Sequence, residues 1–237
     1  MKRRRVGAAL ARWLVGLFLA VGLAAALAAA ETQKGRLRIL QNGQPIGSEQ
    51  YEIAGTGTEI HARSTVTLTA GGQGVRQSSS LLLTAGLAPR SYEWKMEEPE
   101  GKWCRVAFAE GQATIRFLRP DGKEEEQVFD FKTERVAVLD INFFHHYLFL
   151  ARLYDFAQGG PQSIQVFIPQ SVQPGMVTVD LHGVTPQTVD GRTQPVRQLS
   201  ITTQDNQLNL WVTESGRFVR LQVPGANVEV VPESAAP

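Results

Sequence analysis

Most of the chain alternates apolar and polar residues with a period of two, which is the pattern of a β-strand with one buried and one solvated face. The first such run covers residues 36–41 and is followed by Asn42-Gly43, a pair that suits a two-residue hairpin turn because both residues tolerate positive φ. The alternation then resumes up to Ile53. These residues predict an opening β-hairpin.

The same alternation recurs along the rest of the chain and is separated by turn signals such as Asp121-Gly122 and Asp190-Gly191. The further runs cover residues 59–69, 75–83, 90–96, 103–108, 114–118, 127–131, 163–168, 176–181, 196–202, 208–212, 218–223 and 228–231. About a dozen short strands at this spacing are typical of an antiparallel barrel, roll or sandwich. We expect no parallel α/β unit.

Residues 141–156 interrupt the alternation, because they are too long and too continuously apolar for a strand. Asp140 is a suitable N-cap before them, and Gly159-Gly160-Pro161 is a suitable helix stop after them. We therefore expect one long helix. At helical spacing its apolar stripe is Phe143, Tyr147, Leu150 and Tyr154. Its opposite half includes Asn142, His145 and Arg152, for which a solvated face is the simplest interpretation.

A helix this apolar cannot lie on a surface, so it should pack into the concave side of a curved sheet. The predicted fold is therefore mainly β: an antiparallel barrel, roll or sandwich of about a dozen strands with one long apolar helix in the concave face of a curved sheet. No linker-like stretch divides the chain. We expect a single domain over residues 35–232 and a short disordered tail at 233–237.

The first 30 residues have the order of a cleavable signal peptide: basic residues 2–5, an uncharged apolar run at 13–27, and alanines 28–30. We expect cleavage after Ala30 and a bacterial periplasmic location. An uncleaved anchor is the alternative, since residues 13–30 could just cross a bilayer. The arginines also resemble a twin-arginine signal, but no serine precedes them. No cysteine follows the apolar run, which excludes a lipidated N-terminus.

Set apart from this leader, the chain is mildly acidic. Five of its 24 Lys and Arg residues lie in the first 30 positions, which contain no acid, so the remainder carries 19 bases against 23 acids. Nucleic acids and anionic lipid surfaces bind clustered cations, which the remainder lacks. We expect no nucleic-acid partner, and contact with the membrane only through the signal peptide before cleavage.

The residues that could carry catalysis or bind metal do not form a recognisable set. His145 and His146 are adjacent, whereas two metal ligands on one helix are usually spaced i, i+4. His61 and His182 lie on separate predicted strands without Cys or carboxylates at ligand spacing. Cys104, the single cysteine, lacks a cationic neighbourhood that would lower its pKa, so we interpret it as a small buried side chain. We expect no catalytic residues, no metal and no cofactor.

Several segments together resemble the bacterial exported β-spiral, or spiral β-roll, families of unknown function. They are Asn42–Gly47 (NGQPIG), Leu87–Lys95 (LAPRSYEWK), Val138–Asp155, Gly159–Gln170 and Leu208–Pro224. The resemblance covers most of the mature chain by pattern. It implies an antiparallel spiral β-roll or open half-barrel, with the long apolar helix packed in its concave face, and a role in the cell envelope. The curved sheet of these families is similar to the open half-barrels of the LolA and LolB lipoprotein carriers, whose concave face holds acyl chains. The motifs contain no catalytic set to carry over.

Two interpretations of function remain open, besides an unrecognised enzyme. In the first, the concave face binds a lipid, an acyl chain or an extended peptide; Phe143, Tyr147, Leu150 and Tyr154 line the groove, and Asn142, His145 and Arg152 form its rim. In the second, the core is filled and the protein is a scaffold that contacts another envelope protein. An open apolar groove of several hundred Å³ between helix and sheet would favour the first interpretation.

Overall fold

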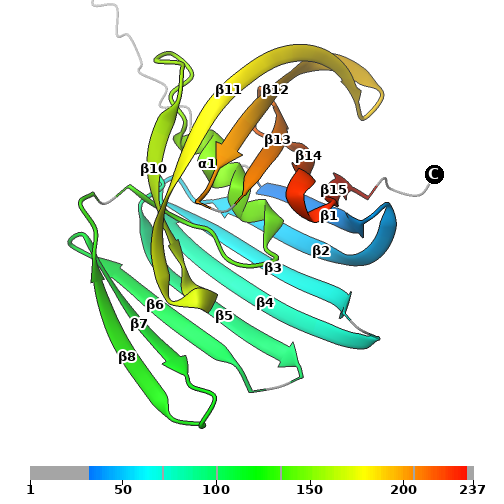
Figure 1. Cartoon of the computed structure of the whole chain (residues 1–237). Helices are drawn as coiled ribbons and strands as arrows, with labels where there is room; N and C mark the ends of the chain where they lie inside the picture. Colours follow the sequence, from blue (N-terminus) through cyan, green and yellow to red (C-terminus); the bar gives the residue numbers. More distant parts are fainter. Residues whose placement is uncertain (1–31, 71, 100, 134, 205, 234–237) are drawn as a thin grey trace, which may run out of the picture.

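The strands of this protein form one continuous sheet that curls around a short helix (Figure 1). The computed structural model describes residues 32–70, 72–99, 101–133, 135–204 and 206–233, and in this part of the chain the sheet has fifteen strands. The predicted signal peptide, residues 1–30, lies outside the described residues. Residues 234–237 of the expected tail also lie outside them.

The first half of the sheet is a run of antiparallel hairpins in chain order. Its strands are β1 (Thr32–Gln41), β2 (Gln44–Gly55), β3 (Glu59–Ala70), β4 (Gln73–Thr84), β5 (Pro89–Glu98), β6 (Trp103–Ala109), β7 (Gln112–Leu118) and β8 (Glu124–Asp130). The first hairpin turn has positive φ at both Asn42 and Gly43, as a type I′ turn requires. The predicted opening hairpin is therefore confirmed.

The second half of the sheet continues from β1, because the last strand pairs with the first. Its strands are β9 (Val136–Val138), β10 (Gln162–Ile168), β11 (Gln173–Val189), β12 (Arg192–Thr202), β13 (Gln207–Thr213), β14 (Phe218–Val223) and β15 (Val228–Pro232). The sheet order is β8 to β1 followed by β15 to β9, so β8 and β9 are its two edges. The sheet is open and mainly antiparallel. The strand pattern predicts the antiparallel pairing, and the resemblance to half-barrels predicts the open sheet.

Irregular pairing bends the strands and helps the sheet to curl. The register shifts between Ile39 and Leu40 in β1, between Leu181 and Gly183 in β11, and between Trp211 and Val212 in β13. An extra residue in one strand of a pair increases the local twist and bends that strand. The curled sheet then places its inward side chains around the helix (Figure 1).

The helix is shorter than the sequence predicts. A single turn of 3-10 helix, η1 (Phe144–His146), leads directly into α1 (Tyr147–Leu153), so ten residues are helical instead of the sixteen expected. Asn142 has φ of +69°, a left-handed conformation that cannot continue into a helix. At the other end Tyr154 is already extended. Two further single turns, η2 (Pro169–Ser171) and η3 (Pro224–Ala226), follow β10 and β14.

Two other predictions about the fold are corrected. The sheet has fifteen strands and not about a dozen, and one of them, β9, consists of three buried residues that show no alternation. The expectation of no parallel unit is also wrong, because β9 pairs with β10 in parallel and η1 and α1 lie between them in the chain. A crossover helix is the usual way to join parallel neighbours.

The core lies between the concave face of the sheet and the helix. Phe143, Leu148, Phe149 and Leu150 are each at most 2% exposed. Burial of so many large side chains stabilises the fold by about 1.5–3 kcal/mol for each one. The helix therefore packs against the concave face of the sheet, and the stripe residues Phe143 and Leu150 are part of the core.

Candidate functional site

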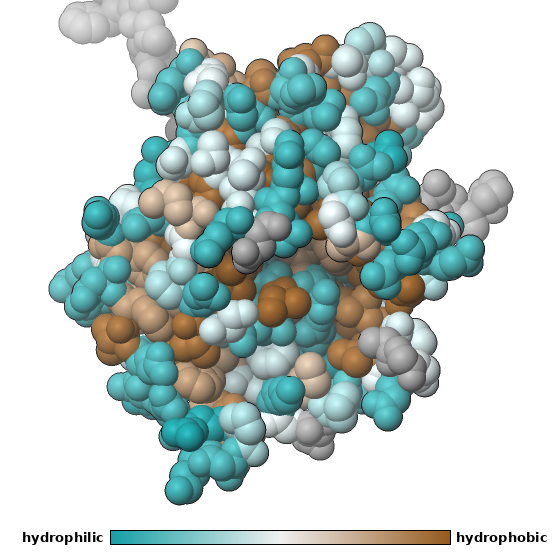
Figure 2. Space-filling model, viewed as in Figure 1, coloured by the Kyte–Doolittle hydropathy of each residue, from teal (hydrophilic) through white to brown (hydrophobic). Residues whose placement is uncertain are grey.

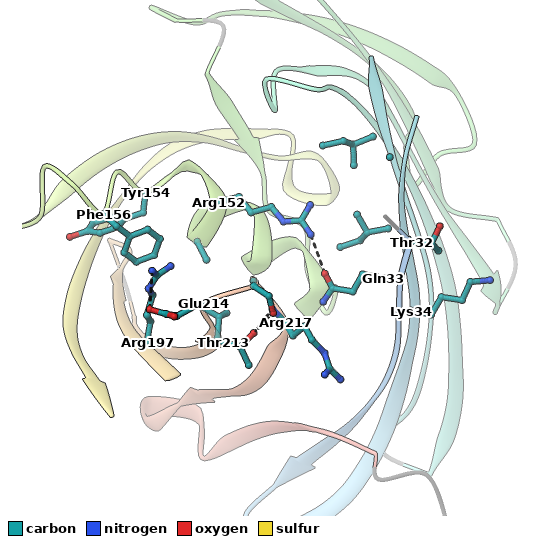
Figure 3. Close-up of a pocket in the computed structure, with 17 residues that line it drawn as sticks. Thr32, Gln33, Lys34, Arg152, Tyr154, Phe156, Arg197, Thr213, Glu214 and Arg217 are labelled. Atoms are coloured by element: carbon teal, nitrogen blue, oxygen red, sulfur yellow. Dashed lines mark hydrogen bonds and ion pairs between the residues drawn. The ribbon is translucent and has the colours of Figure 1, made fainter. Parts of the chain in front are cut away.

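An open pocket of about 580 Å³ lies at the C-terminal end of α1 (Figure 3). Segments from several parts of the chain form it: the start of β1, the end of β2, the start of β3, residues 151–156, Arg197 on β12, and the turn between β13 and β14. A volume of this size is within the range of ligand pockets, roughly 300–1,000 Å³. We therefore take this pocket as the candidate site.

One wall of the pocket is apolar and aromatic. Tyr154 and Phe156 form an edge-to-face pair with ring centroids 4.9 Å apart, and the lining also includes the aliphatic side chains of Ile53, Ile60 and Val212. Tyr154 is fixed from behind, because its hydroxyl donates to the carbonyl oxygen of Gly160 at 2.9 Å. This wall would receive an apolar chain.

The other wall carries three arginines, and each has a defined neighbour. Arg197 lies over the ring of Phe156 at 4.1 Å and is 3.6 Å from Glu214. Arg217 forms an ion pair with Asp190 at 2.5 Å. Arg152 donates to Gln33. A guanidinium has five N–H donors, so one ion pair leaves others for a ligand. This wall would receive an acidic group.

The turn between β13 and β14 sets the direction of these charged side chains. The Thr213 hydroxyl lies 2.8 Å from that of Ser215 and accepts the backbone N–H of Arg217 at 3.1 Å. Gly216 has φ of +76°, which favours glycine at this position. The turn thereby holds Glu214 and Arg217 at the edge of the pocket.

The structure separates the residues that were predicted for the groove. Tyr154 lines the pocket, whereas Phe143 and Leu150 are fully buried in the core. Tyr147 is half-buried on α1 and does not contribute to the pocket lining. As ligand-contacting residues, all four remain predictions.

The predicted rim residues are also separated. Arg152 is exposed and lines the pocket, while Asn142 is half-buried and precedes the helix. His145 was expected on a solvated face, and this is wrong, because its side chain is completely buried. The sheet encloses the first turn of the helix, and a carboxylate from β2 supplies the polar partner that a buried imidazole needs.

That carboxylate belongs to Glu49, which is also completely buried. Its Oε1 accepts the Ser64 hydroxyl at 2.7 Å and lies 2.5 Å from His145 Nδ1. Its Oε2 accepts the backbone N–H groups of Phe144 at 2.8 Å and His145 at 3.3 Å. A buried charge is tolerated when it is paired and hydrogen-bonded, and here both oxygens are occupied.

A second buried group lies beside this one, around Asp140. Its Oδ2 accepts the Tyr92 hydroxyl at 2.6 Å, and its Oδ1 accepts the backbone N–H groups of Ile141 and Gln170 at 3.0 Å each. Burial raises the pKa of Asp140 to about 6. The Asp140 backbone N–H donates to His146 Nδ1 at 3.2 Å. Asp140 therefore ties β5, η1 and η2 together and does not cap the helix.

Contacts connect the pocket to the buried carboxylate. Arg152 Nη2 donates to Gln33 Oε1 at 3.0 Å, and Gln33 Nε2 donates to the Tyr51 hydroxyl at 3.4 Å. The Tyr51 ring stacks on His145 with centroids 5.8 Å apart. Gly35 makes room for Tyr51, because a Cβ at that position would overlap the ring. The geometry of the pocket thus depends on the packing around His145.

The buried groups are poorly arranged for nucleophilic catalysis. Ser64 donates to Glu49 and not to an imidazole, so the serine lacks the base that would activate it. Cys104 is buried, and burial raises the pKa of its thiol, which keeps it protonated. Among the described residues, no group of three or more His, Cys, Asp or Glu side chains is placed to hold a metal ion. The described helices also include none that is long and apolar enough to cross a membrane.

Sequence analysis missed four of the residues that define these sites: Glu49, Asp190, Arg197 and Arg217. For one of them, Glu49, the sequence contains a signal that could have revealed it. Glu49 has the same parity in β2 as Tyr51 and Ile53, both of which face inward, so an acid at that position indicates a buried charge. The other three depend on pairing between distant segments, which periodicity does not reveal.

We predict that Glu49→Ala destabilises the protein by about 3–5 kcal/mol, because it leaves a hydroxyl, an imidazole and two backbone N–H groups without their acceptor. Glu52→Ala is the matched control on the same strand: Glu52 is exposed and pairs with Lys34, so its loss should cost less than about 1 kcal/mol. Urea unfolding followed by tryptophan fluorescence measures both. Equal losses would contradict the role assigned to Glu49.

We also predict a pH-dependent effect of Asp140→Asn. The folded-state pKa of Asp140 is raised to about 6 from 3.8, so folded protein binds this proton more tightly than unfolded protein does. Its contribution to stability is complete below pH 3.8 and is lost as pH rises through 6. Asp140→Asn should therefore be more destabilising at pH 4 than at pH 7, by up to about 3 kcal/mol.

Urea unfolding of wild type and Asp140→Asn at both pH values measures this difference. His146, whose pKa burial lowers well below 6.5, acts in the opposite direction but is present in both proteins. A destabilisation that is the same at pH 4 and pH 7 would show that Asp140 has no raised pKa.

Comparison with known proteins assigns no function to these sites. No protein-family model matches the chain, and no curated protein sequence is significantly similar to it. The likeness to exported β-spiral families therefore stays a prediction from sequence pattern. The pocket and the predicted signal peptide are the features that bear on function.

Proposed function

We propose that this chain is an exported, non-enzymatic protein of the bacterial periplasm that binds an amphipathic ligand in the pocket at the end of α1. The export part of the proposal rests on the charged, apolar and small-residue order of residues 1–30. The non-enzymatic part rests on the lack of an activated nucleophile in the described buried groups. The ligand part rests on the pocket.

The observation that carries the ligand class is the contrast between the two walls. Tyr154 and Phe156 share a pocket of about 580 Å³ with three arginines, and Arg197 lies over the Phe156 ring at 4.1 Å where the two walls meet. An apolar chain that ends in a carboxylate matches both walls, whether the chain is a fatty acid or the C-terminus of an apolar peptide.

The site differs from the groove expected along the helix. Phe143 and Leu150 pack in the core, so a ligand in this structure would lie beyond the C-terminal end of α1 and not beneath it. Tyr154 and Arg152 are the two predicted site residues that this proposal keeps. Both are held at the pocket by the end of the helix.

A scaffolding role is the second candidate, and the open edges of the sheet favour it. β8 pairs with β7 on one side and is an edge on the other, and Val128 on this strand is 54% exposed. Apolar side chains also gather over the region of β6–β8 (Figure 2). A pocket of about 400 Å³, lined by Phe108, Phe131 and Val136, lies near the gap between β8 and β9. An envelope protein could bind there by strand addition.

Export predicts a defined mass. When the full chain is produced in a bacterium, the periplasmic fraction should contain a protein that begins at Glu31, because signal peptidase cleaves after the small residue Ala30. Intact-mass spectrometry of that fraction measures it. The full 237-residue chain in the membrane fraction would instead support the uncleaved anchor.

Ligand binding predicts a charge requirement. Delipidated protein should bind two carboxylates, decanoate and an apolar tetrapeptide with a free C-terminus, more tightly than it binds the uncharged alcohol decanol. Arg197→Gln should weaken decanoate binding about tenfold, the equivalent of about 1.4 kcal/mol, because it removes a charge-assisted contact. Isothermal titration calorimetry measures each affinity.

Arg220→Gln is the matched control for this experiment. Arg220 also lies over an aromatic ring, that of Trp211 at 5.3 Å, and also pairs with a glutamate, Glu229, but it is outside the pocket. Its replacement should leave decanoate affinity within about twofold of wild type. Equal binding of decanol and decanoate would refute the acidic end group, and no binding of any of the three ligands would favour the scaffold.

A further inference from the structure

Four buried polar atoms near the first turn of the helix have no hydrogen-bond partner in the described part of the protein. They are Gln77 Nε2, Ser79 Oγ, His145 Nε2 and His146 Nε2. All four side chains are at most 6% exposed. An unsatisfied buried donor or acceptor costs about 1–3 kcal/mol, so four in one region need a partner.

Contacts place these atoms in the same region between β4 and η1. The His145 and His146 rings have centroids 4.4 Å apart. Ser79 is the cross-strand neighbour of Ser64, which donates to the same Glu49 oxygen that contacts His145. Gln77 lies two residues before Ser79, so both side chains point to the same concave face of β4.

Tyr92 closes this group from the other side. Its ring lies edge-on to His146 with centroids 5.7 Å apart. Trp94 holds the Gln77 side chain, because Trp94 Nε1 donates to Gln77 Oε1 at 2.9 Å. The Gln77 oxygen is therefore used, and its amide nitrogen is the atom left to donate.

The hydrogen bonds at Nδ1 determine the tautomer of each histidine. His145 Nδ1 lies 2.5 Å from a Glu49 oxygen, so it must carry the proton of that hydrogen bond. His146 Nδ1 accepts the backbone N–H of Asp140, so it must carry a lone pair. Burial and the neighbouring His145 lower the pKa of His146 well below 6.5, which keeps this ring neutral. Its proton is then on Nε2.

The two free nitrogens are therefore complementary: His146 Nε2–H is a donor, and His145 Nε2 is an acceptor when its ring is neutral. We propose that a buried water molecule binds between them, accepting from His146 Nε2–H and donating to His145 Nε2, with Ser79 and Gln77 as its remaining partners. A buried water typically makes about three hydrogen bonds, and this site supplies up to four.

The same tautomers argue against a metal ion at this position. A metal would need a lone pair on both Nε2 atoms, but His146 Nε2 carries a proton as long as its Nδ1 accepts the Asp140 N–H. Water fits because it can accept from one ring and donate to the other. The water would connect β4 to η1.

Two measurements on the mature wild-type chain test this proposal. A crystal structure should show one ordered water in contact with both Nε2 atoms. Long-range 1H–15N NMR should show the Nδ1–H tautomer for His145 and the Nε2–H tautomer for His146. No ordered water between the rings, or a proton on His146 Nδ1, would overturn the proposal.

A matched pair of variants provides an independent test. Ser79→Ala removes one partner of the water, whereas Ser80→Ala changes the next residue of β4, which is exposed on the opposite face. Magnetic relaxation dispersion should show a long-lived internal water in wild type and Ser80→Ala, with a residence time about tenfold shorter in Ser79→Ala. The same residence time in all three proteins would contradict the assigned partners.

Discussion

The buried carboxylate of Glu49 is the interaction on which the arrangement of this protein depends. It lies on β2, yet it accepts hydrogen bonds from the first turn of a helix that begins 95 residues later. A charge without exposure is stable when every lone pair has a partner, and Ser64, His145 and two backbone N–H groups supply these partners. The helix is thereby fixed to the first half of the sheet.

The position of the candidate pocket follows from this anchor. With its first turn held at Glu49, the helix packs against the concave face, and its C-terminal end delivers Arg152 and Tyr154 to the opening between β1 and the β13–β14 turn (Figure 3). Tyr51 connects the two places, because it stacks on His145 and bonds to Gln33 in the pocket wall. The packing of the core therefore influences the shape of the pocket.

Local signals were sufficient to predict most of the sheet. Alternation and positive-φ turns such as Asn42-Gly43 depend on neighbours within a few residues, so they can be read along the chain. The strand β9 was not predicted, because its three residues are all buried and show no alternation of apolar and polar side chains. The helix was overestimated because the apolar run 141–156 reports burial, and burial continues beyond both helix ends, at Phe143 and at Tyr154.

The sequence by itself determined the strand pattern, the hairpin turns, the mainly β class and the presence of a buried helical segment, because each of these depends on local residue order. The tertiary structure decided the rest. It set the parallel pairing of β9 with β10, the burial of His145 against Glu49, and the meeting of Arg197 with Phe156. The residues that pair between β9 and β10 are 29 positions apart, Phe156 and Arg197 are 41 positions apart, and Glu49 and His145 are 96 positions apart. Their geometry exists only once the sheet has curled, so no local pattern encodes it.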